Sequence, residues 1–257
     1  MVVAEKIVAV LNNVPGPVAA SFRNDTLLAR ALRPLVNRLV PPGPTPIVVR
    51  SGPGAGLHLL IYPRSEKYYW TGTHEMPVQQ ALVSILKPGM TFWDIGSHIG
   101  FFTLLASRCV GPTGQVHAFE PMDQNRARLL DGVQQNGGKN ITVHDCALAA
   151  TSGEAVLYPH GSSLMWTLIP ERGSRGGLTV RCCTLDECGL SVPPPDLIKI
   201  DTEGAEVDVL RGGLNFLTAR RPALIVEFSD EVLLAEARKL LSFYTFERLA
   251  PRHWLVR

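Results

Sequence analysis

The sequence has little net charge and no concentration of one sign. Its 25 lysines and arginines nearly balance 23 aspartates and glutamates, which leaves a net charge of +2. Proteins that bind a nucleic-acid backbone usually gather positive charge on one face. The near balance therefore argues against nucleic acid as a partner.

Paired cysteine motifs are also absent. The five cysteines contain no CxxC pair, and no histidine stands at zinc-finger spacing from them. An odd number of cysteines without such motifs is typical of reduced thiols. We therefore expect a cytoplasmic protein without a bound metal.

Long apolar runs are lacking too. No stretch reaches the roughly 18 apolar residues that a spanning helix needs, and the start MVVAEKIVAVLNNVPG has an early acid and no convincing cleavage site. We expect no integral membrane segment. A peripheral membrane contact by the N-terminal helices and a homo-oligomer both stay open.

The first part of the chain predicts a small extension. Two amphipathic helices are expected at residues 2–12 and 25–40, and PPGPTP at 41–46 ends that region. The segments IVVR and GLHLLIY, joined by SGPGA, predict a β-hairpin within residues 47–62. No helix is expected after the glycines of SGPGA, so they are turn formers and not a nucleotide loop.

From residue 74 onwards the pattern alternates between strands and helices, which indicates a parallel sheet covered on both faces. The predicted strands are 91–95, 115–119, 141–146, 196–201 and 223–228, with an antiparallel pair at 244–249 and 253–257. The predicted helices are 77–86, 100–109, 122–136, 203–218 and 230–241. Two extra strands, 153–158 and 178–183, bracket a loop at 159–177 that would serve either as a lid or as a connector.

Polar residues stand at the carboxyl ends of these strands, where ligands lie in open parallel sheets. Asp94 closes the first strand, and Gly96 and Gly100 flank the turn before a helix whose free amides would point at a ligand. We expect glycine at both positions because a side chain would occupy the ligand's space. Taken alone, this DxGxxxG pattern is a weak signal, because glycine turns after strands are common and Asp94 also suits a cap of the following backbone.

Two further carboxylates end the next two strands. Glu120 stands 24 residues after Gly96, a spacing at which a carboxylate accepts both hydroxyls of a ribose. It also precedes Pro121 and would suit a helix start. Asp145 ends the third strand, within reach of an adenine amino group.

A second informative stretch is DLIKIDTEGAEVDVLRGGLNFL at 196–217. Asp201 ends the fourth strand, and Glu203 and Glu206 fall in the first turn of the predicted helix. Acids in a first turn stabilise the helix dipole by about 0.3 to 1 kcal/mol each, which explains Glu206. Asp201 and Glu203 would face the same crevice as Asp94.

The segments DIGSHIGFFTLLA, VHAFEP, TLDEC and above all IKIDTEGAEVDVLRGG resemble the FkbM-type family of S-adenosylmethionine-dependent methyltransferases, over residues 68–249. The resemblance implies an α/β, class I methyltransferase (Rossmann-like) three-layer sandwich with a seven-stranded, mostly parallel sheet whose last strand is antiparallel. Residues 68–257 would form the S-adenosylmethionine-binding domain, and residues 1–67 an N-terminal extension of helices and a hairpin.

The resemblance also implies site residues. Cofactor contacts are implied at Asp94, Gly96, His98, Gly100, Glu120, Asp145, Cys146 and Asp201. Asp201 and Glu203 would lie by the reacting centre. His98 departs from the family, which usually has asparagine in this turn; an imidazole can replace that contact, act as a base or titrate near neutral pH.

The implied reaction is methyl transfer to a hydroxyl oxygen of a small molecule such as a sugar, a macrolide or another metabolite. Positioning the acceptor in line with the methyl carbon and sulfur supplies about 7 to 11 kcal/mol, and a general base adds about 10²- to 10⁴-fold. Asp201 or Glu203 is the candidate base, and His160 is a third. Magnesium on Asp201, Glu203 and Glu227 is a weaker alternative.

Other functions stay open. A catalytically silent nucleotide-sensing or interaction module would use the same crevice. A nucleic-acid amino methyltransferase would need a polar-Pro-Pro-aromatic motif after the fourth strand, whereas VPPPDL at 192–197 precedes that strand. Methylation of a protein side chain has no sequence feature for or against it.

Overall fold

The computed structural model describes residues 41–160, 165–167 and 176–257, and side chains within these ranges except at 159, 160 and 165–167. The two helices predicted at 2–12 and 25–40 and the side chain of His160 lie outside the described residues. The hairpin prediction is confirmed, because β1 (Thr45–Val48) pairs antiparallel with β2 (His58–Ile61). The domain boundary at residue 67 stays a prediction.

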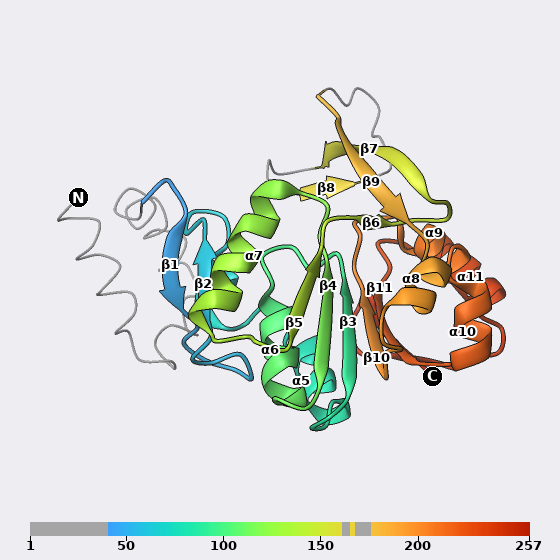
Figure 1. Ribbon diagram of the computed structural model, residues 1–257, viewed down its shortest axis with the longest axis horizontal. Helices are drawn as coiled ribbons and strands as arrows, with labels where there is room; N and C mark the ends of the chain where they lie inside the picture. Colours follow the sequence, from blue (N-terminus) through green and yellow to red (C-terminus); the bar gives the residue numbers. More distant parts are fainter. Residues whose placement is uncertain (1–40, 161–164, 168–175) are drawn as a thin grey trace.

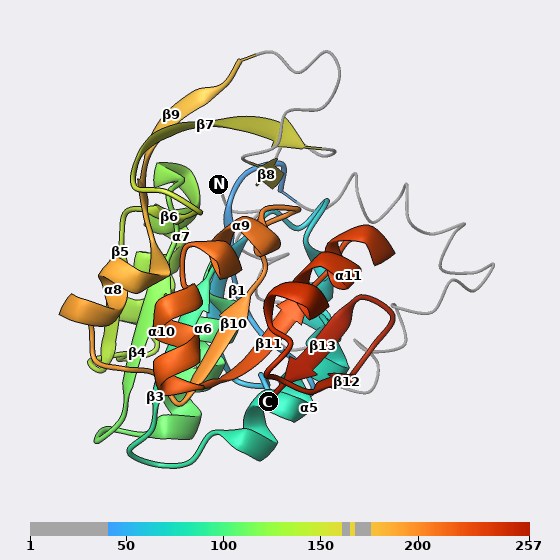
Figure 2. The same ribbon diagram turned by 90° about the vertical axis from the view of Figure 1, so that its right-hand side faces the viewer.

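A seven-stranded sheet forms the centre of the protein, in the order β12-β13-β11-β10-β3-β4-β5 (Figure 1, with β12 and β13 labelled in Figure 2). Its strands are β3 (Thr91–Ile95), β4 (Gln115–Phe119), β5 (Ile141–His144), β10 (Leu197–Ile200), β11 (Ala223–Glu227), β12 (Phe246–Arg248) and β13 (His253–Val256). The five strands from β11 to β5 run parallel, and β13 is antiparallel to both of its neighbours. This is the class I methyltransferase fold, with the strand order reversing between β3 and β10.

Helices cover both faces of this sheet because successive residues of its buried strands point to opposite sides. On β3, Phe92 packs into one apolar cluster and Trp93 into the other. The first cluster contains side chains of β1, β2, α4 (Lys67–Thr71), α5 (Met76–Ile85) and α6 (Phe101–Val110). The second contains those of α8 (Leu185–Ser191), α9 (Glu206–Arg211), α10 (Leu214–Arg220) and α11 (Glu231–Leu240). The helix α7 (Asp123–Gln135) packs against β2 and β5.

A second sheet stands beside the carboxyl ends of the main strands, in the order β6-β9-β7-β8. It contains β6 (Ala147–Leu148), β7 (Gly153–His160), β8 (Met165–Thr167) and β9 (Leu178–Cys183). Figure 2 shows β7 and β9 as long ribbons that extend beyond the main sheet. The strands predicted at 153–158 and 178–183 are thus confirmed, whereas β6, β8, α4 and α8 were not predicted. The strand β8 lies within the loop predicted at 159–177, most of which is outside the described residues.

The helix predicted at 203–218 is wrong as a single element. Residues 203–205 form a turn, and the helix breaks at Gly212 and Gly213 into α9 and α10. The break lies where Gly212 approaches the backbone after β6, since a Cβ there would stand 2.1 Å from the carbonyl oxygen of Ala149. The apolar period continues through the break, which is why the period alone did not reveal it.

None of the helices in the described ranges has both the length and the apolar character that a membrane span requires.

We predict that Gly212→Ala destabilises the protein by about 1 to 3 kcal/mol, the usual cost of overpacking. The added methyl group would overlap the carbonyl oxygen of Ala149. Hydrogen bonds hold both backbones, because the N–H of Ala149 donates to the carbonyl of Cys183 and the carbonyl of Gly212 accepts from the N–H of Asp186. Urea unfolding followed by circular dichroism measures the change. Gly43→Ala is the matched control because a Cβ at Gly43 meets nothing within 4 Å; equal stability of the two variants would contradict the prediction.

Candidate active site

A cavity of about 290 Å³ lies at the carboxyl ends of β3, β4, β10 and β11, where the strand order reverses. Ligands of doubly wound sheets bind at such a switch point. The strand ends contribute Ile95, Gly96, Phe119, Glu120, Asp201, Thr202, Glu203 and Glu227. The segment from α4 to the start of α5, called the α4–α5 segment below, contributes Tyr68, Tyr69, His74 and Glu75. The second sheet contributes Ala147, Leu148 and Leu157.

Five of the predicted site residues line this cavity together: Gly96, His98, Glu120, Asp201 and Glu203. Asp94, Gly100, Asp145 and Cys146 do not line it. The sequence also gave no indication of the wall formed by the α4–α5 segment. Its residues carry no motif, and only the packing of α4 against the turn after β3 brings them to the site.

The structure gives a different reason for the two glycines than room for a ligand. Gly96 has φ +77°, and its Cβ would lie 1.8 Å from the carbonyl oxygen of Asp201. Gly100 has φ +84°, and its Cβ would lie 2.2 Å from Cδ1 of Leu129 on α7. Both positions exclude a side chain because other parts of the protein occupy the space.

Asp94 lies beneath the cavity and not on its wall. The residue is fully buried, and its Oδ2 accepts a hydrogen bond of 2.5 Å from Oγ1 of Thr103 on α6. Its Oδ1 has no hydrogen-bond partner within the described part of the chain. Burial raises the pKa of Asp94, and the ammonium of Lys199 opposes that shift. Asp94 therefore ties the end of β3 to α6.

Asp145 does not reach the cavity. The strand β5 ends at His144, and the Asp145 side chain is 64% exposed and pairs with Arg181 at 2.6 Å. Cys146 is buried in the apolar cluster beneath α8. The wall that the sequence assigned to these residues is formed instead by Ala147 and Leu148 of β6.

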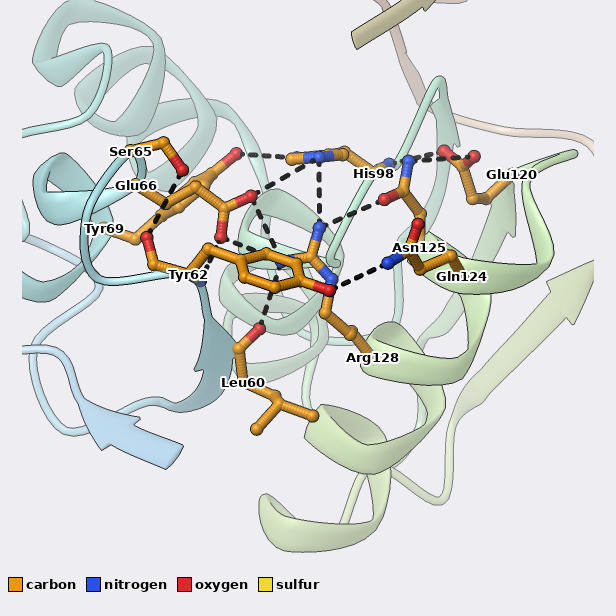
Figure 3. Close-up of polar contacts among 10 residues, drawn as sticks. All are labelled: Leu60, Tyr62, Ser65, Glu66, Tyr69, His98, Glu120, Gln124, Asn125 and Arg128. Atoms are coloured by element: carbon orange, nitrogen blue, oxygen red, sulfur yellow. Dashed lines mark hydrogen bonds and ion pairs between the residues drawn. The ribbon is translucent and has the colours of Figure 1, made fainter. Parts of the chain in front are cut away.

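Glu120 is a buried carboxylate on the cavity wall, with only 5% of its surface exposed. The backbone N–H of His98 donates to its Oε2 at 2.8 Å (Figure 3). The N–H of Met122 donates to its Oε1 at 3.0 Å. Burial raises the pKa of Glu120 to about 7, although these hydrogen bonds act in the opposite direction. Ligand groups that donate to this carboxylate would therefore favour its ionised form.

His98 is held in a left-handed turn with φ +50°, a conformation in which asparagine, aspartate and histidine are all enriched among residues other than glycine. Its Nδ1 lies 3.1 Å from the hydroxyl of Tyr69, and its Nε2 lies 3.5 Å from the guanidinium of Arg128 (Figure 3). Burial and the charge of Arg128 lower the pKa of His98 to about 3. A neutral imidazole is therefore expected near pH 7, and titration of His98 in that range stays an untested prediction.

A buried ion pair holds this turn against the N-terminal hairpin region. Arg128 on α7 pairs with Glu66 at 2.8 Å, and both side chains are at least 97% buried. Glu66 also accepts the backbone N–H of Tyr62 at 2.7 Å. Figure 3 shows that the pair lies directly beside His98. The only sequence signal for it is an arginine on the otherwise buried face of α7.

Asp201 and Glu203 follow β10 and face the cavity. Oδ2 of Asp201 accepts a hydrogen bond of 2.8 Å from Nζ of Lys199, which is itself buried. Burial raises the pKa of Asp201; Lys199 opposes the shift and the carboxylates of Glu227 and Glu75 add to it. Glu203 lies in the turn before α9 with φ +55°, so its placement in the first helical turn is wrong.

Glu206 has a larger role than helix-dipole stabilisation. Its side chain is buried, and its Oε1 accepts from the backbone N–H groups of Thr202 and Gly204 and from the Thr202 hydroxyl. These bonds fix the turn that carries Glu203. The dipole explanation for this residue was therefore incomplete.

Comparison with known proteins places this site in a family context. The profile of the methyltransferase FkbM domain matches residues 94–248, more than half of the chain. A curated relative, the hexuronic acid methyltransferase AglP of Haloferax volcanii, is 29% identical over 170 residues, which cover 65% of this chain and 68% of the relative.

Solved structures are more distant. A methyltransferase FkbM from Methylobacillus flagellatus aligns with 15% identity and a TM-score of 0.47 over 74% of this chain, and the alignment spans only 53% of that structure's chain. Aeropyrum pernix fibrillarin with bound S-adenosyl-L-methionine aligns with 13% identity and a TM-score of 0.45, over 69% of this chain and 73% of that one. Structural similarities of this degree do not indicate which reaction the protein catalyses.

We predict that Glu66→Gln destabilises the protein by about 3 to 5 kcal/mol, because it leaves the Arg128 charge buried without its partner. Chemical unfolding measures the loss. Asp123→Asn is the matched control on the same helix. It breaks the ion pair between Asp123 and Arg126, in which the Asp123 side chain is 89% exposed. Such pairs are worth less than about 1 kcal/mol, and equal losses in the two variants would contradict the prediction.

Proposed function

The chain belongs to the FkbM family of S-adenosylmethionine-dependent methyltransferases, and we propose that it transfers the methyl group to a hydroxyl oxygen of a small molecule. One observation carries the proposal. The cavity at the strand switch point has the buried carboxylate of Glu120 on its β4 side and the carboxylates of Asp201 and Glu203 on its β10 side. The β4 side of the cavity would hold the nucleoside part of S-adenosylmethionine, and the β10 side would hold the acceptor.

The residues that line the cavity fit S-adenosylmethionine. Among the described residues, five carboxylates and a single arginine face the cavity, an excess of negative charge that suits a sulfonium cation carrying an ammonium group. Apolar side chains beside Glu120 would pack against a flat base: Ile95, Phe119, Met122 and Leu148. The remaining lone pairs of Glu120 would accept the ribose hydroxyls.

Bound S-adenosylmethionine would supply an electrophilic methyl group, so the protein has to orient the acceptor and remove its proton. Oδ2 of Asp201 is held by Lys199 at 2.8 Å, which leaves Oδ1 to accept the hydroxyl proton. Burial raises the pKa of this carboxyl group and makes it a stronger base than an exposed aspartate. Glu203, in its fixed turn, would position the hydroxyl or share this role.

A sugar is the acceptor class that we favour. The relative from Haloferax volcanii is named for hexuronic acid. On the acceptor side of this cavity, Arg252 is 51% exposed and pairs with Glu227 at 3.1 Å. A guanidinium at this position would bind the carboxylate or ring oxygens of such a sugar.

We predict that Asp201→Asn lowers the rate of methyl transfer by about 10²- to 10⁴-fold while S-adenosylmethionine affinity changes less than tenfold. Glu203→Gln is expected to slow transfer as well, and it leaves the buried Lys199 with its partner. The measurement uses labelled methyl donor with a panel of neutral and acidic sugars and hydroxylated metabolites. Isothermal calorimetry reports cofactor binding for each variant.

Three outcomes of that experiment differ in meaning. Transfer that depends on Asp201 or Glu203 supports the proposal. Binding of the cofactor without transfer to any acceptor would favour a nucleotide-sensing module. Absence of affinity for S-adenosylmethionine and S-adenosylhomocysteine would overturn the proposal altogether.

The raised pKa of Glu120 predicts a pH dependence of cofactor binding. Ribose hydroxyls donate to the ionised carboxylate, whereas the free protein holds it half protonated at about pH 7. The dissociation constant for S-adenosylmethionine should therefore rise about tenfold for each pH unit below 7 and level off above it. Calorimetry between pH 5.5 and 8.5 measures this, and Glu120→Gln should bind weakly without the pH dependence.

A further inference from the structure

We propose that Glu75, Glu227 and His253 form a binding site for a divalent first-row metal ion on the β11 side of the cavity. Their ligand atoms, one from each side chain, all lie within 4.8 Å of one another. The site differs from the magnesium set of Asp201, Glu203 and Glu227 that the sequence suggested as an alternative, because only Glu227 is common to both.

The fold brings these residues together from three elements. Glu227 is the last residue of β11 and His253 the first of β13, and the antiparallel register places them directly opposite each other. Glu75 is the N-cap residue of α5. Both glutamates line the cavity, so an ion at this place would be reached from it.

The geometry fits metal coordination better than hydrogen bonding. Nε2 of His253 lies 3.2 Å from Oε2 of Glu75 and 3.4 Å from Oε2 of Glu227. Both contacts are ion pairs when His253 is protonated. Across the described ranges, however, neither His253 Nε2 nor Glu75 Oε2 is aligned for a hydrogen bond, although both atoms are buried. A hydrogen bond places the acceptor on the N–H axis, whereas a metal occupies that axis and its other ligands lie to the side.

Two of the three separations between ligand atoms also agree with coordination, and the third, between the two carboxylates, lies within 4.8 Å. Ligands at about 2.0 to 2.2 Å from a tetrahedral zinc ion lie roughly 3.3 to 3.6 Å from one another. The two nitrogen–oxygen separations, 3.2 and 3.4 Å, are close to that range. The histidine is 9% exposed, so its Nε2, which faces both carboxylates, lies in a nearly closed site.

Each carboxylate is oriented by a second interaction that leaves one oxygen for the ion. Oε1 of Glu227 lies 3.1 Å from Nε of Arg252, and Oε1 of Glu75 lies 3.3 Å from Nε2 of His74. In both cases Oε2 is the oxygen that faces His253. Metal-binding side chains commonly have such outer partners, which fix their orientation.

The ligand chemistry limits the ion. One imidazole and two carboxylates suit Mn²⁺, Fe²⁺ or Zn²⁺, whereas Mg²⁺ and Ca²⁺ favour oxygen ligands alone. Three protein ligands leave at least one position for water or a substrate oxygen. That this position receives the acceptor, and thereby lowers the pKa of its hydroxyl group, rests on the proposed function.

Direct binding of Mn²⁺ tests the site without any methyl acceptor. Chelator-treated full-length protein is titrated with MnCl₂ while electron paramagnetic resonance follows the free ion, and Zn²⁺ is added as a competitor. We expect one Mn²⁺ per chain, displaced by Zn²⁺. His253→Gln and Glu227→Gln should each weaken binding by at least about tenfold, the loss that disturbing a ligand's outer partner already causes.

Glu236→Gln is the matched control, because Glu236 is an exposed glutamate on α11 that pairs with Arg211 outside the cavity. It should bind Mn²⁺ like the wild type. If His253→Gln fails to fold by circular dichroism, Glu75→Gln takes its place in the comparison.

Two results would overturn the site. One is a wild-type protein that leaves both Mn²⁺ and Zn²⁺ free up to millimolar concentration, as expected if a proton on His253 alone compensates the two carboxylates. The other is unchanged Mn²⁺ binding in the ligand variants. S-adenosylmethionine affinity is measured separately without metal, so failure of the methyltransferase proposal is recognised independently.

Discussion

The close approach of the loops that follow β3 and β10 is the constraint on which the cavity depends. The backbone N–H of Asp201 donates to the carbonyl of Ile95 at 3.1 Å, and that of Gly96 donates to the carbonyl of Phe119 at 3.1 Å. The carbonyl oxygen of Asp201 then occupies the space that a Cβ on Gly96 would need. These contacts hold the ends of β3, β4 and β10 together. Because Glu120 follows β4 and Asp201 follows β10, the contacts also set the separation between these two residues.

The second constraint is the burial of charged side chains beneath and beside the cavity. Asp94 and Lys199 are direct partners in the register of β3 and β10, and Lys199 reaches up to Asp201. One buried ammonium thus supports carboxyl groups below and beside the cavity, while burial raises the pKa of Asp94, Glu120 and Asp201. Burial disfavours the ionised form of these carboxyl groups, and a nearby positive charge favours it. Binding of a cationic ligand would therefore stabilise their ionised form.

The sequence was informative where a local rule operates. The strand TFWDI was placed correctly because a run of buried residues is bounded by turn signals, and Glu120 because the end of β4 is fixed by the same rule. Long-range contacts left no such pattern. The pairing of Glu66 with Arg128 spans 62 positions, and the direction of the Asp145 side chain depends on where β5 stops. The turn around Glu203 was not predicted either. It is held by the side chain of Glu206, which accepts from the backbone N–H groups of Thr202 and Gly204. The apolar period of the sequence gives no indication of such a side-chain contact.

The two sides of the cavity have separate origins in the chain. Glu120 and Gly96 belong to strand ends inside the main sheet, whereas Tyr68, Glu75 and Arg252 come from the α4–α5 segment and from the connection between β12 and β13. Mutations in these connections leave the strand junction untouched. Under the proposed function, acceptor choice would therefore diverge during evolution while the strand ends that would hold the nucleoside stay unchanged, and grafting connections between relatives would be a route to new acceptor specificity.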